Sequence, residues 1–221
     1  MSEAALAGIG MTSRRTRLRL QAQLQAAGID HPKVLGLLRD MPRHLFVDTA
    51  LASRAYDDVA LPIGYGQTIS RPSVVARMSQ ALLADGEPAR VLEIGTGCGY
   101  QTAILSQLAG EVCSIERIEP LYRQARDRLV RMRFAGIRLH HGDGTLGWPQ
   151  ALDFDAILLT AAPVEVPPAL LAQLAPGGRL IAPVHEGGAA QRLRKLVRTP
   201  QGYEYHDLGE VNFVPLLEGT Q

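Results

Sequence analysis

The sequence predicts an α/β fold with a mostly parallel sheet, and three features of the chain lead to this prediction. From residue 90 onward short apolar runs alternate with helical stretches, glycines join the first run to the first helix, and the last two runs have no helix between them. Apolar strands separated by helices form parallel sheets that are buried on both faces. The expected parallel strands are 91–95, 112–116, 137–143, 154–161 and 178–184, the helices between them are 100–108, 120–134 and 166–174, and the antiparallel C-terminal strands are 193–199 and 210–217.

The first ninety residues predict a helical lobe. Apolar residues at helical spacing, with suitable residues at the starts and stops, indicate helices over 12–28, 30–41 and 71–83. The turn-like segment 85–90 separates them from the sheet. We therefore expect residues 1–89 to form an N-terminal lobe packed on a core of residues 90–221, within one structural domain.

The stretch ALPIGYGQTIS, residues 60–70, lies between two of these helical patterns and shows no obvious strand or ordinary turn. Loops with a defined structure on a rigid scaffold often carry binding or catalytic residues. We therefore expect this loop to belong to a binding site.

Composition and charge narrow the class of protein. The 221 residues are 46% hydrophobic and 20% charged with a net charge of +1, so no overall basic field predicts a nucleic-acid partner. No apolar stretch approaches the roughly 18 residues of a membrane span, and the N-terminus lacks the charged start and apolar run of a secretory signal. Cys98 and Cys113 have no metal-ligand spacing and are expected to be reduced thiols. We expect a soluble, cytoplasmic monomer that binds neither nucleic acid nor a membrane.

The glycines after the first core strand predict a nucleotide-containing cofactor. The segment EIGTGCGY, residues 93–100, places a G-x-G-x-G turn between a strand and a helix, where the backbone can approach a ligand closely. A dinucleotide site has G-x-G-x-x-G, and here Tyr100 stands where the third glycine would be. Glu93 would face phosphates poorly, but it suits a cofactor that carries an ammonium group and a sulfonium. A nicotinamide dehydrogenase is therefore disfavoured.

Acidic residues follow the next two strands. Glu116 can accept hydrogen bonds from both hydroxyls of a ribose, and Asp143, between Gly142 and Gly144, lies within reach of an adenine amino group. Taken alone, Glu116 could instead cap a helix. The order of acid, glycines, acid and acid is typical of enzymes that use S-adenosyl-L-methionine (AdoMet), and it predicts a Rossmann-like class I AdoMet-dependent methyltransferase fold.

Further motifs make a family resemblance visible. The chain resembles the protein-L-isoaspartate O-methyltransferases over roughly residues 42–217, in the runs PRHLFV, AYDDVALPIGYGQTIS, VLEIGTGCGYQTAIL, SIER, HGDGTLGW, FDAILLTAA, LAPGGRLIAPV and FVPL. The resemblance implies a bacterial-type repair enzyme that methylates the α-carboxylate of L-isoaspartyl residues and releases S-adenosyl-L-homocysteine. The methyl ester then closes to a succinimide, which partly hydrolyses to normal aspartate.

The resemblance also assigns residues to roles. It makes Ser70 the active-site serine, with Thr68 and Ile69 beside the reactive end of the cofactor, and it places small residues along the acceptor site. Gln191 and the 213–216 segment are expected to help hold the peptide. The expected cofactor-binding residues are Thr68, Ile69, Glu93, Gly95, Thr96, Gly97, Gly99, Glu116, Asp143 and Gly144, and the expected substrate-binding residues are Thr160, Ala161, Ala162 and Val214.

This chemistry requires few catalytic groups. The nucleophile is a carboxylate that is already ionised at pH 7, and the sulfonium is a good leaving group, so we expect catalysis by positioning in a site with little water. Ser70 has a competing interpretation as the N-cap of the helix that follows. It is not expected to be a covalent nucleophile, because it lacks the G-x-S-x-G elbow and identifiable His and Asp partners.

Other features admit simpler interpretations. His140 and His141 are adjacent on a predicted strand and so point to opposite faces, which argues against a shared metal ion. Trp148 is expected to pack in the core near the cofactor site. The alternatives that remain open are a methyltransferase for another carboxylate or a small molecule, and a module that binds AdoMet without catalysis.

Overall fold

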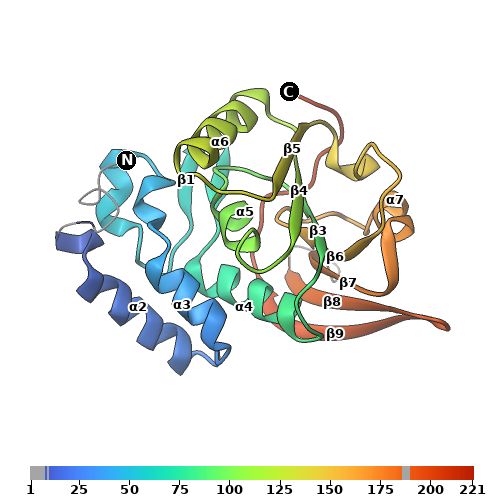
Figure 1. Cartoon of the computed structure of the whole chain (residues 1–221), viewed down its shortest axis with the longest axis horizontal. Coiled ribbons are helices and arrows are strands. Elements are labelled where there is room, and N and C mark those ends of the chain that lie inside the picture. Colours follow the sequence, from blue (N-terminus) through green and yellow to red (C-terminus); the bar gives the residue numbers. More distant parts are fainter. Residues whose placement is uncertain (1–7, 9, 186–189) are drawn as a thin grey trace.

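The computed structural model describes residues 8, 10–185 and 190–221, and Figure 1 shows a twisted sheet with helices against it and a group of N-terminal helices along one side. The expectations about the first residues, namely that they carry no secretory signal and begin the helical lobe, fall in part on residues 1–7 and 9, which lie outside the described residues.

The central sheet confirms the predicted α/β architecture. In the described part of the chain it has seven strands in the order β5-β4-β3-β6-β7-β8-β9. Neighbours from β5 to β7 pair in parallel, whereas β7, β8 and β9 pair antiparallel. The strands are β3 (Arg90–Ile94), β4 (Glu111–Glu116), β5 (Ile137–His141), β6 (Phe154–Leu159), β7 (Leu174–His185), β8 (Gln191–Thr199) and β9 (Gly202–Val211). The strand order reverses between β3 and β6, which is where open sheets of this kind bind ligands.

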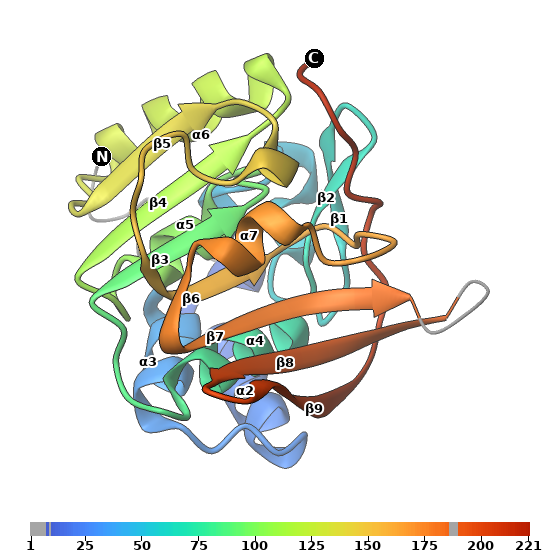
Figure 2. The same ribbon diagram turned by 90° about the vertical axis from the view of Figure 1, so that its right-hand side faces the viewer.

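Helices cover both faces of the sheet. Helices α4 (Pro72–Leu83), α5 (Tyr100–Leu105) and α6 (Glu119–Arg131) lie behind it in Figure 2, and α7 (Pro168–Ala172) lies in front, with the short η4 (Gly144–Leu146) also contacting α7. The strand residues alternate between these faces. Val91 packs in the cluster that includes α4 and α5, and Leu92 packs in the cluster that includes α7. Strands buried on both faces explain why the sequence shows nearly continuous apolar runs.

The N-terminal lobe shares a hydrophobic core with the sheet. It contains η1 (Gly10–Thr12), α2 (Arg14–Ala26), α3 (Pro32–Asp40), η2 (Arg43–Leu45) and η3 (Thr49–Arg54). Leu38 of α3 and Phe46 after η2 belong to the same cluster of buried residues as Val91 and Ile104 of the core. The lobe is therefore packed on the sheet through apolar contacts.

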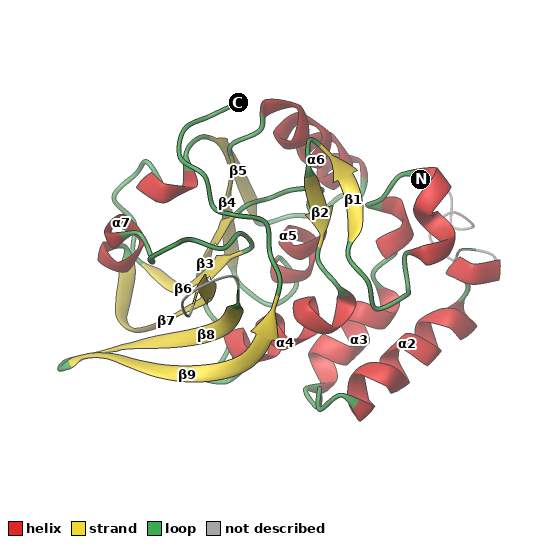
Figure 3. Cartoon of the chain, turned by 180° about the vertical axis from the view of Figure 1, so that it is seen from behind, coloured by secondary structure: helices red, strands yellow, loops and turns green. Residues whose placement is uncertain are grey.

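The segment 60–70 forms a β-hairpin that was not apparent from the sequence pattern. Strands β1 (Leu61–Gly64) and β2 (Gln67–Ile69) pair antiparallel. The residues that join them, Tyr65 and Gly66, both have positive φ, at 53° and 69°. Such turns match the twist of the paired strands, but they are usually signalled by Asn-Gly or Gly-Gly rather than by Tyr-Gly. Figure 3 shows the hairpin beside α5, with the segment that follows β9 running past it.

The last predicted strand, 210–217, was mostly misplaced. Strand β9 begins at Gly202 and ends at Val211, so only residues 210 and 211 of the predicted strand belong to the sheet. Residues 212–217 instead cross to the end of β6, where the amides of Ala162 and Leu216 bond to the carbonyls of Val214 and Ala162, each at 2.8 Å. Proline has no amide hydrogen to donate to a ladder, and Pro215 stands in the middle of this crossing. The excursion brings the chain to the edge of the sheet where the site lies.

Candidate active site and cofactor pocket

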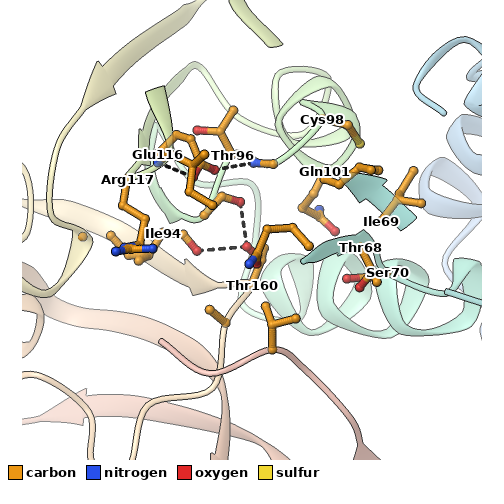
Figure 4. Close-up of a pocket in the computed structure, with 18 of the residues that line it drawn as sticks. Thr68, Ile69, Ser70, Ile94, Thr96, Cys98, Gln101, Glu116, Arg117 and Thr160 are labelled. Carbon is orange, nitrogen blue, oxygen red and sulfur yellow. Dashed lines mark hydrogen bonds between the residues drawn. The ribbon is translucent and has the colours of Figure 1, made fainter. Parts of the chain in front are cut away.

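A pocket opens at the carboxyl ends of the parallel strands, next to the point where the strand order reverses. Its walls come from the turn after β3, the ends of β4 and β6, the β1–β2 hairpin and the segment after β9. Figure 4 shows Glu116 and Arg117 on one side, Thr68, Ile69 and Ser70 on the other, and Thr160 between them. Of the residues expected from the sequence, those that line this pocket are Thr68, Ile69, Ser70, Gly95, Thr96, Gly97, Glu116, Gly144, Thr160, Ala161 and Val214, and those that do not are Glu93, Gly99, Asp143 and Ala162.

The glycine turn needs glycine for two different reasons. Gly95 has φ +99°, and a Cβ there would lie 2.3 Å from the Thr160 hydroxyl, which itself donates to the Gly95 carbonyl at 2.6 Å. Gly95 therefore allows the end of β6 to approach the turn. Gly99, at φ +85°, packs against Leu129 of α6, 3.3 Å from where a Cβ would stand. Gly99 serves the contact between helices rather than the pocket.

Glu116 connects the glycine turn to the end of β4. Its side chain is buried, and its two carboxylate oxygens accept the amides of Gly97 at 2.7 Å and Ile118 at 2.9 Å. Helix α6 begins at Glu119, so these bonds do not satisfy the amides of its first turn, and the helix-cap alternative was wrong. Each carboxylate oxygen has a second lone pair, so Glu116 can still accept hydroxyl groups from the pocket.

Glu93 does not lie where the sequence analysis placed it. It is the fourth residue of β3 and points toward α5, where it is fully buried. One of its oxygens accepts the hydroxyls of Thr102 and Ser114, at 2.5 and 2.6 Å, and the other has no hydrogen-bond partner among the described residues. Burial raises the pKa of Glu93 to about 8, against the opposing effect of these two hydroxyls. The side chain is therefore a neutral acid at pH 7, beneath the glycine turn.

Asp143 bonds to the C-terminal tail, residues 217–221. One carboxylate oxygen accepts the amide and hydroxyl of Thr145, and the other accepts the amide of Gly219 at 2.6 Å. Although burial alone would raise the pKa of Asp143, the bonds from Gly219 and Thr145 hold it below its ordinary value. The tail is also bonded to the segment between β4 and α6, because Gln221 donates its amide to the Arg117 carbonyl and its own carbonyl accepts the amide of Glu119. The family resemblance ended at residue 217, so no sequence signal revealed this tail.

Ser70 faces the pocket, and the competing interpretation of this residue as an N-cap was wrong. Arg71 is the N-cap residue of α4, and the carboxylate of Asp58 accepts the amide and hydroxyl of Ser73, each at 2.8 Å. Asp58 thus provides the capping bond that the competing interpretation assigned to Ser70. The Ser70 hydroxyl has no hydrogen bond to any residue that the structure describes, which leaves it available to a ligand.

The acceptor side is built on the end of β6. Thr160, Ala161 and Val214 line the pocket, while Ala162 is buried and uses its backbone to hold the segment after β9. The amide side chain of Gln191 makes two bonds to the backbone of Phe213, so it fixes this segment rather than reaching the pocket. A second cavity shares Thr68, Ser70, Thr160 and Val214 with the first, and it extends along this segment.

The remaining candidates have packing roles. His140 places its ring against Trp148, whereas the His141 ring lies near Tyr122, so the two histidines point to opposite faces as expected. Within the described ranges, no group of three His, Cys, Asp or Glu residues could hold a metal ion. Trp148 is buried in the core cluster of Leu92 and does not line the pocket. Among the same residues, no helix combines the length and apolar character needed to cross a membrane.

The sheet order, the glycine turn after β3 and the acidic side chain at the end of β4 together define a class I methyltransferase. Comparison with protein families then narrows the class. The chain belongs to the protein-L-isoaspartate(D-aspartate) O-methyltransferase family, whose model matches residues 15–221. The family and the fold that the sequence predicted are confirmed.

Individual proteins agree with this assignment. The chain is 55% identical over 217 residues to protein-L-isoaspartate O-methyltransferase 1 of Marinobacter nauticus, covering 98% of both chains, and 55% identical over 220 residues to the protein-L-isoaspartate O-methyltransferase of Halorhodospira halophila, covering 99% of both. A solved protein-L-isoaspartate O-methyltransferase superposes with a TM-score of 0.81 at 26% identity, over 90% of this chain and 65% of that one. A Plasmodium falciparum structure described by the same activity, in complex with S-adenosyl-L-homocysteine, has the same fold, with a TM-score of 0.78 at 24% identity over 90% of this chain and 97% of that one.

Proposed function

We propose that this chain transfers a methyl group from AdoMet to the α-carboxylate of L-isoaspartyl residues in damaged proteins and peptides. The observation that carries the proposal is the meeting of two walls in one pocket. The glycine turn and Glu116 form a nucleotide-binding wall, and Thr68 to Ser70 form an opposite wall with an unbonded hydroxyl. The α-carboxylate gains the methyl group as an ester, and S-adenosyl-L-homocysteine leaves.

The residues present fit this cofactor. The carboxylate of Glu116 would accept the ribose hydroxyls, and the backbone of Gly95 and Gly97 would contact the methionine portion of the cofactor. Gly144, which lines the pocket after β5, and the adjacent Asp143 would hold the adenine, with the two oxygens of Asp143 also accepting the bonds from Thr145 and the tail. Glu93 and Gly99 would contribute from behind the turn by fixing its shape.

Bound AdoMet would supply an electrophilic methyl group, and the chain's own residues would place the nucleophile. The carboxylate of an isoaspartyl residue is ionised at neutral pH, so no general base is needed. The Ser70 hydroxyl would donate to one carboxylate oxygen and leave the other to attack the methyl carbon. A neutral donor orients the carboxylate without strongly lowering its nucleophilicity. Thr160, Ala161 and Val214 would leave room for a peptide backbone and would exclude water.

We propose a cytoplasmic monomer, in which the lobe of residues 1–89 and the core of residues 90–221 form one structural domain, and which binds neither nucleic acid nor a membrane. The unpaired, buried thiols of Cys98 and Cys113 support a reducing compartment. Light scattering of the purified chain would measure its oligomeric state.

The proposal is tested with one synthetic peptide in two forms, isoaspartyl and normal aspartyl, and with AdoMet labelled in its methyl group. We expect base-labile label in the isoaspartyl peptide alone. Transfer to neither form, while S-adenosyl-L-homocysteine binds with micromolar affinity, would contradict the proposed substrate and favour another carboxylate or a small-molecule acceptor. Binding without transfer to any acceptor would favour a module without catalysis.

A further inference from the structure

Arg43 lies in the interior of the protein without an acidic partner. It belongs to η2 in the helical lobe, and its side chain is completely buried. No carboxylate of a described residue lies within ion-pair distance of it, and its Nη1 atom has no hydrogen-bond partner there. Burying a charge without a counter-charge is strongly unfavourable. An unbranched apolar side chain such as methionine could fill similar space without this penalty. The presence of arginine therefore indicates a role beyond packing.

The guanidinium contacts both walls of the pocket. Nε donates to the carbonyl of Ala55 at 2.8 Å, and Nη2 donates to the carbonyl of Ser70 at 2.7 Å. The group also lies 4.8 Å from the ring centroid of Tyr100, the first residue of α5 after the glycine turn. Ser70 and Tyr100 both line the pocket, one on the acceptor side and one on the cofactor side. Arg43 therefore contacts both walls directly. Methyl transfer requires that these walls hold the acceptor and the cofactor in the correct relative position.

The bond to Ser70 acts on the backbone of a residue whose side chain is otherwise free. Ser70 lies between the end of β2 and the start of α4, and its hydroxyl bonds to no described residue. The bond from Arg43 fixes the orientation of the peptide group that follows Ser70, and so helps to set the direction of its side chain. The planar guanidinium can serve the Ala55 and Ser70 carbonyls at once, which a lysine ammonium cannot do with the same geometry.

We propose that Arg43 is a positioning residue for methyl transfer: it holds the Ser70 hydroxyl at a fixed place relative to the cofactor turn, through the Ser70 carbonyl and the Tyr100 ring. This inference rests on the proposed function, because it takes Ser70 to contact the carboxylate of the substrate. A displacement of about 1 Å at a reacting group can lower turnover by about 100-fold. Arg43 thus affects the rate without contacting the substrate.

Arg17 provides a matched control within the same lobe. It is also buried, it also donates to backbone carbonyls, those of Thr12 and Asp40, and it lies 5.3 Å from the ring centroid of Tyr56. None of these partners lines the pocket. Replacing Arg17 therefore removes bonds to backbone carbonyls and a ring contact of the same kinds, and none of these three partners belongs to either wall.

The experiment is a double-mutant cycle between Arg43 and Ser70, measured on the isoaspartyl peptide. The variants are Arg43→Met, Ser70→Ala, the two together, Arg43→Lys and Arg17→Met, and each is characterised by kcat, KM for the peptide, Kd for S-adenosyl-L-homocysteine and Tm. We expect Arg43→Met to lower kcat by about tenfold or more with Kd changed less than about threefold, and to have little further effect once Ser70 is alanine. Arg43→Lys should fall between the natural chain and Arg43→Met, and Arg17→Met should lower Tm while kcat stays within about twofold.

Several results would overturn the inference. Equal losses of kcat from Arg43→Met with and without the Ser70 hydroxyl would show that Arg43 does not act through Ser70. A loss that appears only as weaker S-adenosyl-L-homocysteine binding would assign Arg43 to the cofactor wall alone. If Arg43→Met does not fold, the cycle is run with Arg43→Lys, and additive losses there have the same meaning. Failure of the proposed function is distinguishable, because the natural chain would then not methylate the isoaspartyl peptide. An unchanged kcat for Ser70→Ala in an active enzyme would instead remove Ser70 from the acceptor site and overturn this inference alone.

Discussion

Replacing Glu93 by glutamine should remove a pH dependence from the stability of this protein. Burial raises the pKa of Glu93 from an ordinary value of 4.5 to about 8. In the unfolded chain the carboxyl loses its proton near pH 4.5, whereas in the folded protein it keeps the proton until about pH 8. The folded state is therefore at no disadvantage below pH 4.5, it loses stability as the pH rises through this window, and the loss is complete above pH 8.

The size of the effect follows from the two pKa values. A tenfold change in the folding equilibrium for each pH unit of the window amounts to at most about 5 kcal/mol, of which about 3–4 kcal/mol falls between pH 5 and pH 8. Glutamine keeps an oxygen that can accept the hydroxyls of Thr102 and Ser114, but it cannot ionise. Its amide hydrogens add an offset that is the same at every pH, so the diagnostic quantity is the slope rather than the stability at one pH.

The assay is urea unfolding followed by circular dichroism at pH 5, 6, 7 and 8, for the natural chain and for Glu93→Gln. We expect the difference in unfolding free energy to shift by about 3–4 kcal/mol in favour of Glu93→Gln across this range. Glu204→Gln is the control, because Glu204 is exposed on β9 and its carboxyl remains solvated in both states. Parallel curves for the natural chain and Glu93→Gln would mean that Glu93 is ionised in the folded protein, and the argument from burial would be refuted.

Further predictions concern the pocket and the C-terminal tail. Glu116→Ala should weaken AdoMet binding by about 1–3 kcal/mol, because it removes the acceptor of the ribose hydroxyls and leaves the Gly97 amide without its partner; calorimetric titration would measure this, and unchanged affinity would exclude Glu116 from the cofactor site. Ser70→Ala should lower kcat while largely sparing the Kd of S-adenosyl-L-homocysteine, and steady-state rates equal to those of the natural chain would remove Ser70 from the acceptor site. Ending the chain at residue 217 removes Gly219, which donates to Asp143 at 2.6 Å. Stopped-flow measurement should then find S-adenosyl-L-homocysteine dissociating severalfold faster, and an unchanged rate would show that the tail does not retain the cofactor.

Much of the core could be predicted from residues that are neighbours in the chain. The strands at 91–95, 112–116 and 154–161 are apolar runs because both faces of the sheet are covered, and such runs are visible without a structure. The glycine turn was equally visible from its G-x-G-x-G spacing after the first core strand. In the structure Gly95 and Gly97 both have positive φ, and the close approach of Thr160 also excludes a Cβ at Gly95. Local sequence thus contained the order of the elements and the place of the cofactor turn.

The level at which a residue lies along the sheet was harder to predict. Glu93 and Glu116 are both acidic and both stand near the end of a strand, yet Glu93 is buried under α5 and Glu116 lines the pocket. Glu93 pairs with Ser114, and Glu116 follows two residues later in β4, so the two side chains point to the same face of the sheet and Glu116 lies nearer its carboxyl edge. The register between the two strands decides this difference, and the sequence does not contain the register.

The sequence by itself determined the class of fold, because apolar periodicity and glycine turns depend on residues that are close in the chain. The resemblance of its motifs to a known family indicated the family and the segments that build the pocket. The tertiary structure alone decided that Arg43 holds the carbonyl of Ser70 across 27 positions, that Asp58 caps the helix in place of Ser70, and that the tail bonds to Asp143. These contacts join groups far apart in the sequence. Local sequence does not reveal which donor and acceptor will pair, because only the packed core brings them within hydrogen-bond distance.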